Sequence, residues 1–148
     1  MLPSSLDRPY DFAITRLQAA QGDVQALPEP LQTLLMVESA HTLIEAGGLV
    51  FFYEADFPNN PPYEAFAAAY RRIGAHAAAL CIAETAALFP FADPELFEPL
   101  RQLWLEKLQT EGHGRFQRLS DEIAGDEAVW EKLAVYVAAH GSAFAKAP

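Results

Sequence analysis

Apolar residues recur every three or four positions along most of the chain, and this spacing predicts amphipathic helices. Glycines and prolines separate the helical stretches, as is usual at helix ends. The predicted helices span residues 9–20, 29–46, 62–89, 94–110 and 126–140, with a shorter piece at 116–123. A chain of 148 residues is long enough to form one independent core. We therefore expect a single all-α domain over residues 1–148, with its core at about 8–145: an irregular bundle of about five to seven helices with a long central helix.

The longest apolar repeat runs from about residue 62 to residue 89 and would form a helix on the order of 40 Å long. Two alternatives stay open for this stretch: it forms the central helix, or it bends near Gly74. In the helix at 94–110, six large apolar side chains are expected to point inward: Leu96, Phe97, Leu100, Leu103, Trp104 and Leu108.

The stretch between residues 38 and 73 organises the chain. Two adjacent glycines, Gly47 and Gly48, predict the end of a helix and a sharp reversal, because glycine adopts a left-handed backbone without strain. The apolar run at 49–53 is expected to pack between the neighbouring helices, as a helical turn or as a short strand. Two prolines at 61–62 suit the first turn of the next helix.

Several residues of this stretch resemble a family of small acidic all-helical bacterial domains of unknown function, one member of which is described as a DNA-mimic protein (DMP-type). The residues that carry the resemblance are Glu38, Gly47, Gly48, Phe51, Phe52, Tyr53, Ile73, Gly74, Ala75, Tyr136 and Phe144. The resemblance covers most of the chain from about residue 10, and it implies a helical fold and an acidic binding protein. The sequence departs from the family pattern at Ala46 and Glu54, where asparagine is expected, and Glu54 adds acid in place of a polar pocket.

The chain is strongly acidic, with twenty acidic residues against ten basic ones and a net charge of −10. Such a chain is repelled by nucleic acids and by anionic membranes, and it is attracted to basic proteins. No Lys or Arg occurs between Leu17 and Tyr70, where seven acidic residues lie. We predict a partner-binding acidic face formed by Glu29, Glu45, Glu54, Asp56, Glu64, Glu95, Glu98 and Glu106.

The family resemblance implies a DNA mimic, and the charge pattern agrees with it. Such a mimic must hold carboxylates where DNA has phosphates, about every 3.4 Å along one strand. Acids three or four positions apart on rigid helices match this repeat roughly within a factor of two. The first hypothesis is therefore a non-enzymatic DNA mimic that sequesters a basic DNA-binding protein or transcription factor. An immunity-type inhibitor of a nuclease toxin would use the same charges. We leave open whether two copies pair as a homodimer, which exposed aromatics such as Phe57 or Phe91 would allow.

Candidate chemistry is sparse. Glu38, His41 and Glu45 have the i, i+3, i+7 spacing of a carboxylate-bridged metal site, but the sequence lacks the second copy that such sites need. Glu38 and Glu84 each interrupt an apolar stripe, so each needs a partner or a place at the edge of the core. The alternative hypothesis is an enzyme or small-ligand binder with a pocket near Glu38, His41, Tyr53 and Glu84. No catalytic, cofactor or metal motif completes it, so we name no catalytic residue, no cofactor and no metal, and we favour a protein that is not an enzyme.

The sequence also predicts the compartment. Residues 1–12 lack a basic start followed by an apolar core, so we expect no secretory signal. The apolar run at 75–92 is interrupted by His76, Glu84 and Pro90 and is not expected to span a membrane. A single cysteine fits a reducing environment. We therefore expect a cytoplasmic protein.

Overall fold

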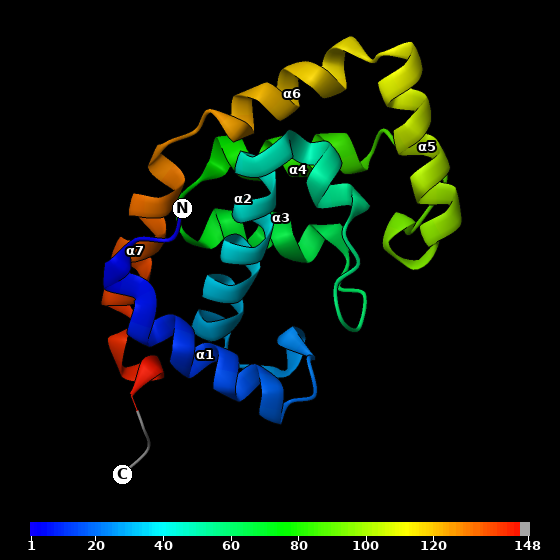
Figure 1. Ribbon diagram of the computed structural model, residues 1–148. Coiled ribbons are helices and arrows are strands. Elements are labelled where there is room, and N and C mark those ends of the chain that lie inside the picture. Colours follow the sequence, from blue (N-terminus) through cyan, green and yellow to red (C-terminus); the bar gives the residue numbers. More distant parts are fainter. Residues whose placement is uncertain (146–148) are drawn as a thin grey trace.

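The structure, a computed structural model, describes residues 1–145 as a bundle of helices (Figure 1). The α-helices are α1 (Asp7–Ala19), α2 (Glu29–Glu54), α3 (Tyr63–Arg72), α4 (His76–Ala86), α5 (Glu98–Glu111), α6 (Gly114–Ala124) and α7 (Ala128–Ala139). Short 3-10 turns lie at Ser4–Leu6, Val24–Ala26, Pro94–Leu96 and Gly141–Phe144. The described residues contain no strand, so the predicted all-α fold with a long central helix is confirmed.

The central helix is α2, which contacts α1, α3, α5, α6 and α7. Its buried apolar side chains include Leu31, Leu34, Met36, Val37, Ala40, Ile44, Leu49 and Phe52. The length and mean hydropathy of α2 would also suit a membrane span, but the core helix of a bundle has the same properties. Packing by five other helices accounts for its apolar composition. The central helix is therefore α2 and not the repeat at 62–89, for which the sequence left open a bend near Gly74.

The helix predicted at 29–46 bends at its two glycines instead of ending there. Gly47 and Gly48 leave the helical conformation, with φ of −156° and +75°, and a further helical segment follows to Glu54. Figure 1 shows the axis of α2 turning aside at its second segment. The predicted break is confirmed, whereas the predicted reversal of the chain is wrong. The apolar run at 49–53 is a helical turn in which three of the five side chains are buried.

The helix predicted at 62–89 is two helices, α3 and α4, which pack side by side (Figure 1). Gly74 separates them with φ of +83°, a conformation that favours glycine. The buried alanines Ala75, Ala78 and Ala79 leave room for close packing after the turn. The bend expected near Gly74 is therefore confirmed, and a single continuous helix over this range is wrong.

Aromatic rings hold the last turn of α2 in the core. Phe52 and Tyr53 both pack edge-on against Tyr63 of α3, with ring centroids 5.5 and 4.8 Å apart. Such contacts add to the free energy gained by burial alone. Phe57 and Phe91 join the border of this cluster and are half-buried, so the expectation that they are exposed is wrong.

The single cysteine of the chain, Cys81, lies on α4. Cys81 is buried, and burial raises the pKa of its thiol to about 11. The Tyr53 hydroxyl donates to the carbonyl oxygen of Ile82 (3.0 Å) and lies 2.6 Å from Thr85 Oγ1. Burial also raises the pKa of Tyr53 far above its ordinary value, so this hydroxyl is a structural group.

Candidate functional site

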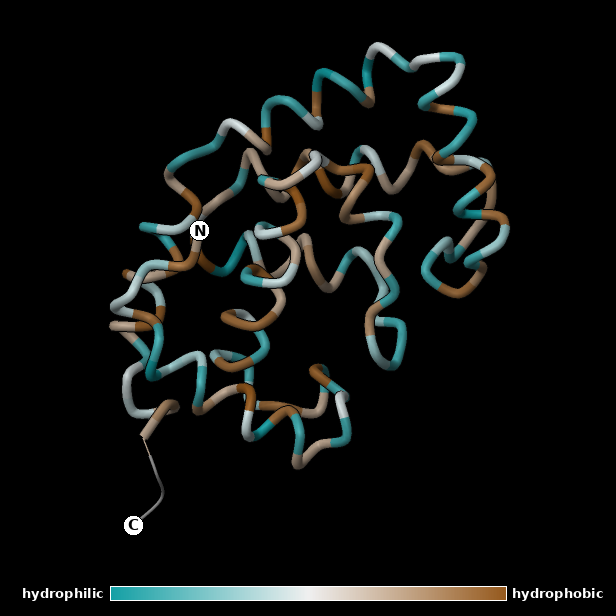
Figure 2. Tube along the Cα trace, in the orientation of Figure 1, coloured by the Kyte–Doolittle hydropathy of each residue, from teal (hydrophilic) through white to brown (hydrophobic). Residues whose placement is uncertain are grey.

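The outer side of α5 and of the turn before it carries exposed apolar side chains, contrary to the prediction from the sequence. Four of the six side chains expected to point inward are exposed: Leu96 (57%), Phe97 (46%), Leu100 (49%) and Leu103 (63%). Leu108 is buried as predicted, and Trp104 is half-buried. Figure 1 shows α5 at the edge of the bundle, and Figure 2 shows hydrophobic positions recurring along it as they do along the core helices.

The side chain that α5 buries is Arg101, which is 1% exposed. Its guanidinium donates to the carbonyl oxygens of Tyr53 (2.7 Å) and Pro94 (2.9 Å), and it forms an ion pair with Asp56. A buried guanidinium is stable when its donors have partners in this way. The contacts join α5 to the end of α2 and set which side of α5 faces the core.

Sequence reasoning missed the role of Arg101, although one signal was present. Arg101, Leu105 and Leu108 recur at i, i+4 and i+7, which is the spacing of a buried stripe. The charged first member makes this stripe look exposed. Its burial depends on carbonyl oxygens from other segments, which the sequence pattern does not reveal.

Four of the eight predicted acidic-face residues lie around α5. Glu98 and Glu106 are exposed on the helix, and Glu95 lies in the turn before it. Glu54 lies beside α5, because Gln102 donates a hydrogen bond to its carbonyl oxygen (2.9 Å). Among the described residues, no Lys or Arg forms an ion pair with these four carboxylates. We define the α5 surface as Glu54, Glu95, Leu96, Phe97, Glu98, Leu100, Leu103 and Glu106.

The other four predicted residues have cationic partners. These pairs are Glu29 with Arg72, Glu45 with the N-terminal amino group, Asp56 with Arg101, and Glu64 with Arg71. Each pair reduces the negative charge offered to a partner, and the pairs at the surface, such as Glu64 with Arg71, contribute little to stability. Of the eight predicted residues, only the four on the α5 surface have carboxylates without such a pair among the described residues.

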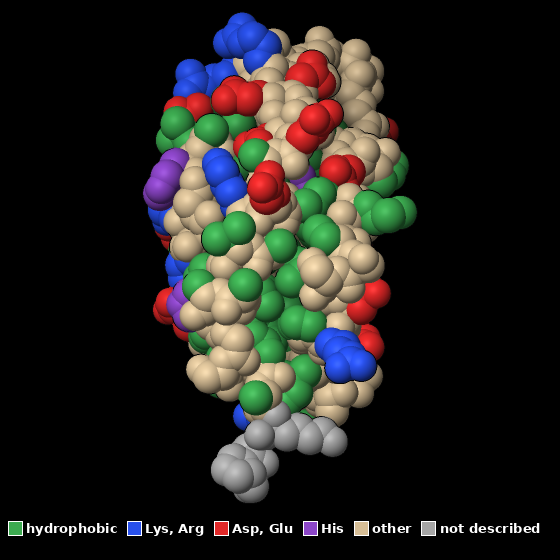
Figure 3. Space-filling model, turned by 90° about the vertical axis from the view of Figure 1, so that its left-hand side faces the viewer, with side chains coloured by type: hydrophobic (Ala, Val, Ile, Leu, Met, Phe, Trp, Pro, Cys, Tyr) green, Lys and Arg blue, Asp and Glu red, His purple; other side chains and the backbone are tan. Residues whose placement is uncertain are grey.

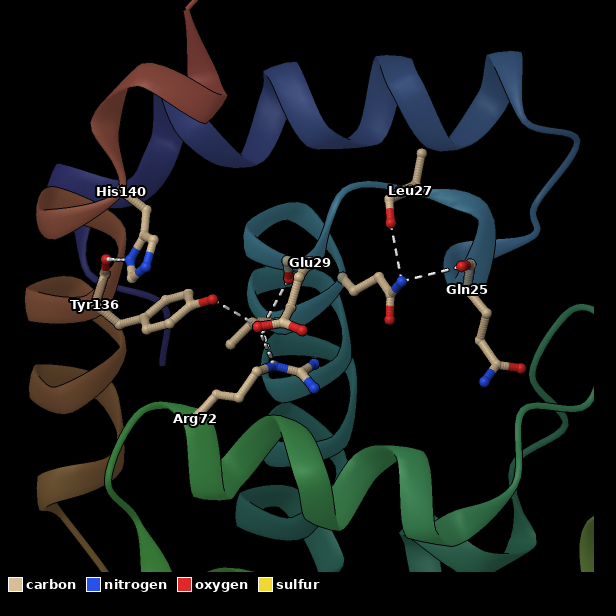
Figure 4. A network of polar contacts seen from close by, with 8 residues as sticks. Gln25, Leu27, Glu29, Arg72, Tyr136 and His140 are labelled. Carbon is tan, nitrogen blue, oxygen red and sulfur yellow. Dashed lines mark hydrogen bonds and ion pairs between the residues drawn. The ribbon is translucent and has the colours of Figure 1, made fainter.

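Glu29 belongs to a polar network that joins α2, α3 and α7 (Figure 4). Arg72 Nε donates to Thr33 Oγ1 at 2.7 Å and lies 3.9 Å from the Glu29 carboxylate. The Tyr136 hydroxyl lies 3.3 Å from the same Thr33 oxygen. The backbone carbonyl oxygen of Tyr136 lies 2.8 Å from His140 Nδ1. This network gives Tyr136, one of the residues behind the family resemblance, a structural role.

Charges also gather at the end of the molecule opposite α5. Figure 3 shows that face, where acidic and basic side chains lie near one another above a region of exposed apolar side chains. Further acids without ion pairs in the described part of the chain surround the start of α7: Asp121, Glu122, Asp126, Glu127 and Glu131. One of them, Asp126, accepts a hydrogen bond from the Ala128 amide (3.1 Å) near the start of that helix. The α5 surface differs from this set in the number of large apolar side chains exposed beside its acids, which is four at α5 against Val135 on α7.

The residues of the alternative small-ligand site lie apart. Their partners differ: Glu38 accepts from Thr42 (3.2 Å), His41 faces the Tyr70 hydroxyl (3.0 Å), Tyr53 donates to Ile82, and Glu84 pairs with Arg115 (3.0 Å). They do not line one pocket. The metal spacing of Glu38, His41 and Glu45 likewise forms no cluster, since no three His, Cys, Asp or Glu side chains within residues 1–145 are placed to hold an ion.

The buried imidazole of His41 is expected to make stability depend on pH. Burial lowers its pKa below the ordinary value of 6.5. Below pH 6.5 the unfolded chain takes up a proton on this residue before the folded protein does. The free energy of unfolding should therefore fall as the pH drops, by at most about 1.4 kcal/mol at pH 5.5. Urea unfolding at pH 7.5 and pH 5.5 measures the loss.

A His41→Gln variant removes this titration, and His76→Gln, at the exposed start of α4, is the matched control. Burial raises the pKa of Glu38, which changes stability with pH in the opposite sense, so the comparison between variants isolates the histidine. The loss between the two pH values should be smaller in His41→Gln than in His76→Gln. Equal losses in both variants would contradict the prediction.

The residues that carry the family resemblance mainly support the fold. Gly48 and Gly74 have positive φ, and Phe52 and Ile73 are buried. Phe51, at the bend of α2, is 46% exposed. These positions hold the bend of α2 and the turn between α3 and α4.

Comparison with protein families finds a match to the model described as DMP19-like protein, over residues 25–140. This range contains α2 to α7, and so it includes both the bend at the glycines and the α5 surface. Searches of the curated proteins and of the solved structures gave no match. Because the family model covers well over half of the chain, the chain belongs to the DMP19-like family, as the resemblance in its sequence predicted.

Proposed function

We propose that the protein is a non-enzymatic acidic binding protein that occupies the DNA-binding surface of a basic partner, as a DNA mimic does. The observation that carries this proposal is the α5 surface, where four carboxylates without ion pairs adjoin four exposed apolar side chains. Membership of the DMP19-like family supports a function of the DNA-mimic type. The net charge of −10 adds a long-range attraction to basic proteins.

The spacing of the α5 carboxylates is compatible with this role. Glu98 and Glu106 lie about 12 Å apart along the helix axis, because an α-helix rises about 1.5 Å per residue. Phosphates on one DNA strand follow about every 3.4 Å, so these two carboxylates correspond to phosphates three or four positions apart. Lys107, next to Glu106 on the same helix, is exposed and places a positive charge beside that acid. We therefore expect the basic side chains of the partner to contact a few separated carboxylates and not a continuous row of them.

The exposed leucines supply a second contribution to binding. Carboxylates steer a basic partner toward the surface, but exposed charge pairs add little affinity. Burial of Leu100 and Leu103 in an interface would contribute about 25 cal/mol for each Å² of apolar surface removed from water. Exposed apolar patches with polar rims mark protein interfaces. The partner should accordingly combine basic side chains with an apolar contact.

Two triple variants with the same charge change test the proposal. One replaces three acids of the α5 surface by glutamine, namely Glu95, Glu98 and Glu106. The control replaces three acids near α7, namely Glu122, Glu127 and Glu131. Immobilised proteins capture basic proteins from the native host, with washes at about 50 and 200 mM salt. The α5 variant should retain roughly tenfold less partner than the wild type, whereas the control should retain nearly as much.

Duplex DNA provides the second arm of the test. If the partner uses its DNA-binding surface, adding its duplex should release it from the immobilised protein. A ternary complex of partner, DNA and this protein would contradict mimicry. Equal losses in the two triple variants would show that general acidity, and not the α5 surface, accounts for binding. A captured nuclease would support the immunity-type alternative.

A further inference from the structure

A pocket lies between α1, α2 and the loop that follows α2, away from the α5 surface. Its volume is about 130 Å³. Most of its wall is apolar, with side chains that include Ile14, Leu17, Val24, Leu35, Phe57 and Phe66. An apolar cavity of about 150 Å³ holds a molecule of the size of benzene. The pocket therefore has the size and lining for one small ring or a short alkyl chain.

One carboxylate stands in this apolar wall. Glu38 is half-buried and accepts a hydrogen bond from Thr42 Oγ1 (3.2 Å), and Tyr10 lines the pocket beside it. Burial raises the pKa of Glu38, and burial with the nearby carboxylate raises that of Tyr10. Within residues 1–145, no Lys or Arg pairs with Glu38. A carboxylate in such a wall is costly without a counter-charge, and a cation in the pocket would offset that cost.

We propose that this pocket binds a small organic cation, a primary amine with an apolar body of about one ring. The ammonium group would lie at the Glu38 carboxylate, and the ring would lie against Leu17 and Phe66. Charge complementarity selects this class of ligand: an anion is repelled by Glu38, and a neutral ring leaves the carboxylate without a counter-ion. None of the pocket residues belongs to the α5 surface, so this site stands apart from the proposed function.

Three probes of similar size and different charge test the site: benzylamine, benzyl alcohol and benzoate. Each is titrated at pH 7 into isotope-labelled protein while backbone amide signals are followed by NMR. Benzylamine should give saturable shifts at residues that line the pocket, such as Leu17, Gly22 and Ser39. Benzyl alcohol should bind roughly tenfold more weakly, because it loses the charge-assisted hydrogen bond, and benzoate should not bind.

Two variants separate this site from non-specific attraction to an acidic protein. Glu38→Gln should weaken benzylamine binding about tenfold and leave benzyl alcohol binding within about twofold, whereas Glu127→Gln, at an exposed acid, should change neither. Ile14→Trp should fill the pocket and abolish binding of both, with thermal unfolding used to confirm that it folds. Shifts spread over the acidic surface, no saturable shift, or unchanged benzylamine affinity in Glu38→Gln would each overturn the proposal.

Discussion

Replacement of Arg101 by methionine is expected to lower the free energy of unfolding by about 3–5 kcal/mol, the usual loss when one member of a buried charged network is removed. Methionine keeps an unbranched side chain but cannot donate to the carbonyl oxygens of Tyr53 and Pro94. Buried acceptors left without partners are the main source of the loss. For a domain of this size the change corresponds to roughly 10 °C in the unfolding midpoint. Urea and thermal unfolding measure the two quantities.

Two controls separate the contributions. Asp56→Asn removes the ion pair alone, and because that carboxylate is half-exposed, it should cost less than about 1 kcal/mol. Arg118→Met changes an exposed arginine on α6 and should stay within about 0.5 kcal/mol of the wild type. If Arg101→Met lost no more stability than Arg118→Met, the guanidinium would not be the anchor of α5.

Substitution of Gly48 by alanine is expected to cost about 2–4 kcal/mol. Gly48 has φ of +75° and ψ of −170°, a backbone conformation in which a side chain is strained. An added Cβ would also lie 2.6 Å from the Ser120 hydroxyl oxygen of α6. That oxygen accepts a hydrogen bond from the Leu49 amide (2.9 Å), so the contact between α2 and α6 would open. Denaturant unfolding of the variant measures the loss.

The matched control is Gly114→Ala at the start of α6. An added Cβ there meets no atom within 4 Å, and its φ is not positive, so the change should be within about 0.5 kcal/mol. A Gly48→Ala variant as stable as Gly114→Ala would mean that the bend of α2 tolerates a side chain. The bend would then have another cause.

The helices that could be predicted are those with one dominant apolar stripe and clear ends. In α7, Val129, Leu133 and Val137 recur every four residues and are all buried, as the pattern indicates. The break at Gly74 was harder, because a single glycine inside a helical pattern is often tolerated. What decides it is the packing of α4 back onto α3, which is a tertiary effect.

The orientation of α5 could not be predicted for a different physical reason. This helix carries two stripes, one with Leu100 and Leu103 and one that begins at Arg101. Hydropathy favours burial of the first stripe. The structure buries the second, because the end of α2 and the turn at Pro94 present carbonyl oxygens that a guanidinium satisfies. The end of α2 lies 48 residues from Arg101 in sequence, so a helical pattern cannot include it.

The acidic face stays a prediction, and the structure adds which of its acids have ion-pair partners. The excess of acid follows from counting, but pairing depends on contacts between distant segments, such as Arg72 with Glu29. The sequence therefore predicted which residues are acidic and not which of them stay without a counter-ion. The apolar half of the α5 surface was missed, because those side chains were assigned to the core. The pairing of the acids and the exposure of the apolar side chains on α5 both depend on tertiary contacts.

The buried position of Cys81 has a practical consequence. Its thiol is buried in the core, and its raised pKa keeps it protonated near neutral pH. Alkylating reagents therefore reach a reactive thiolate only when the structure around α4 opens. A cysteine introduced at the surface can therefore be coupled selectively to a fluorophore or a resin while the native residue stays in place. Attachment at a chosen point, remote from α5, would orient every immobilised molecule in the same way.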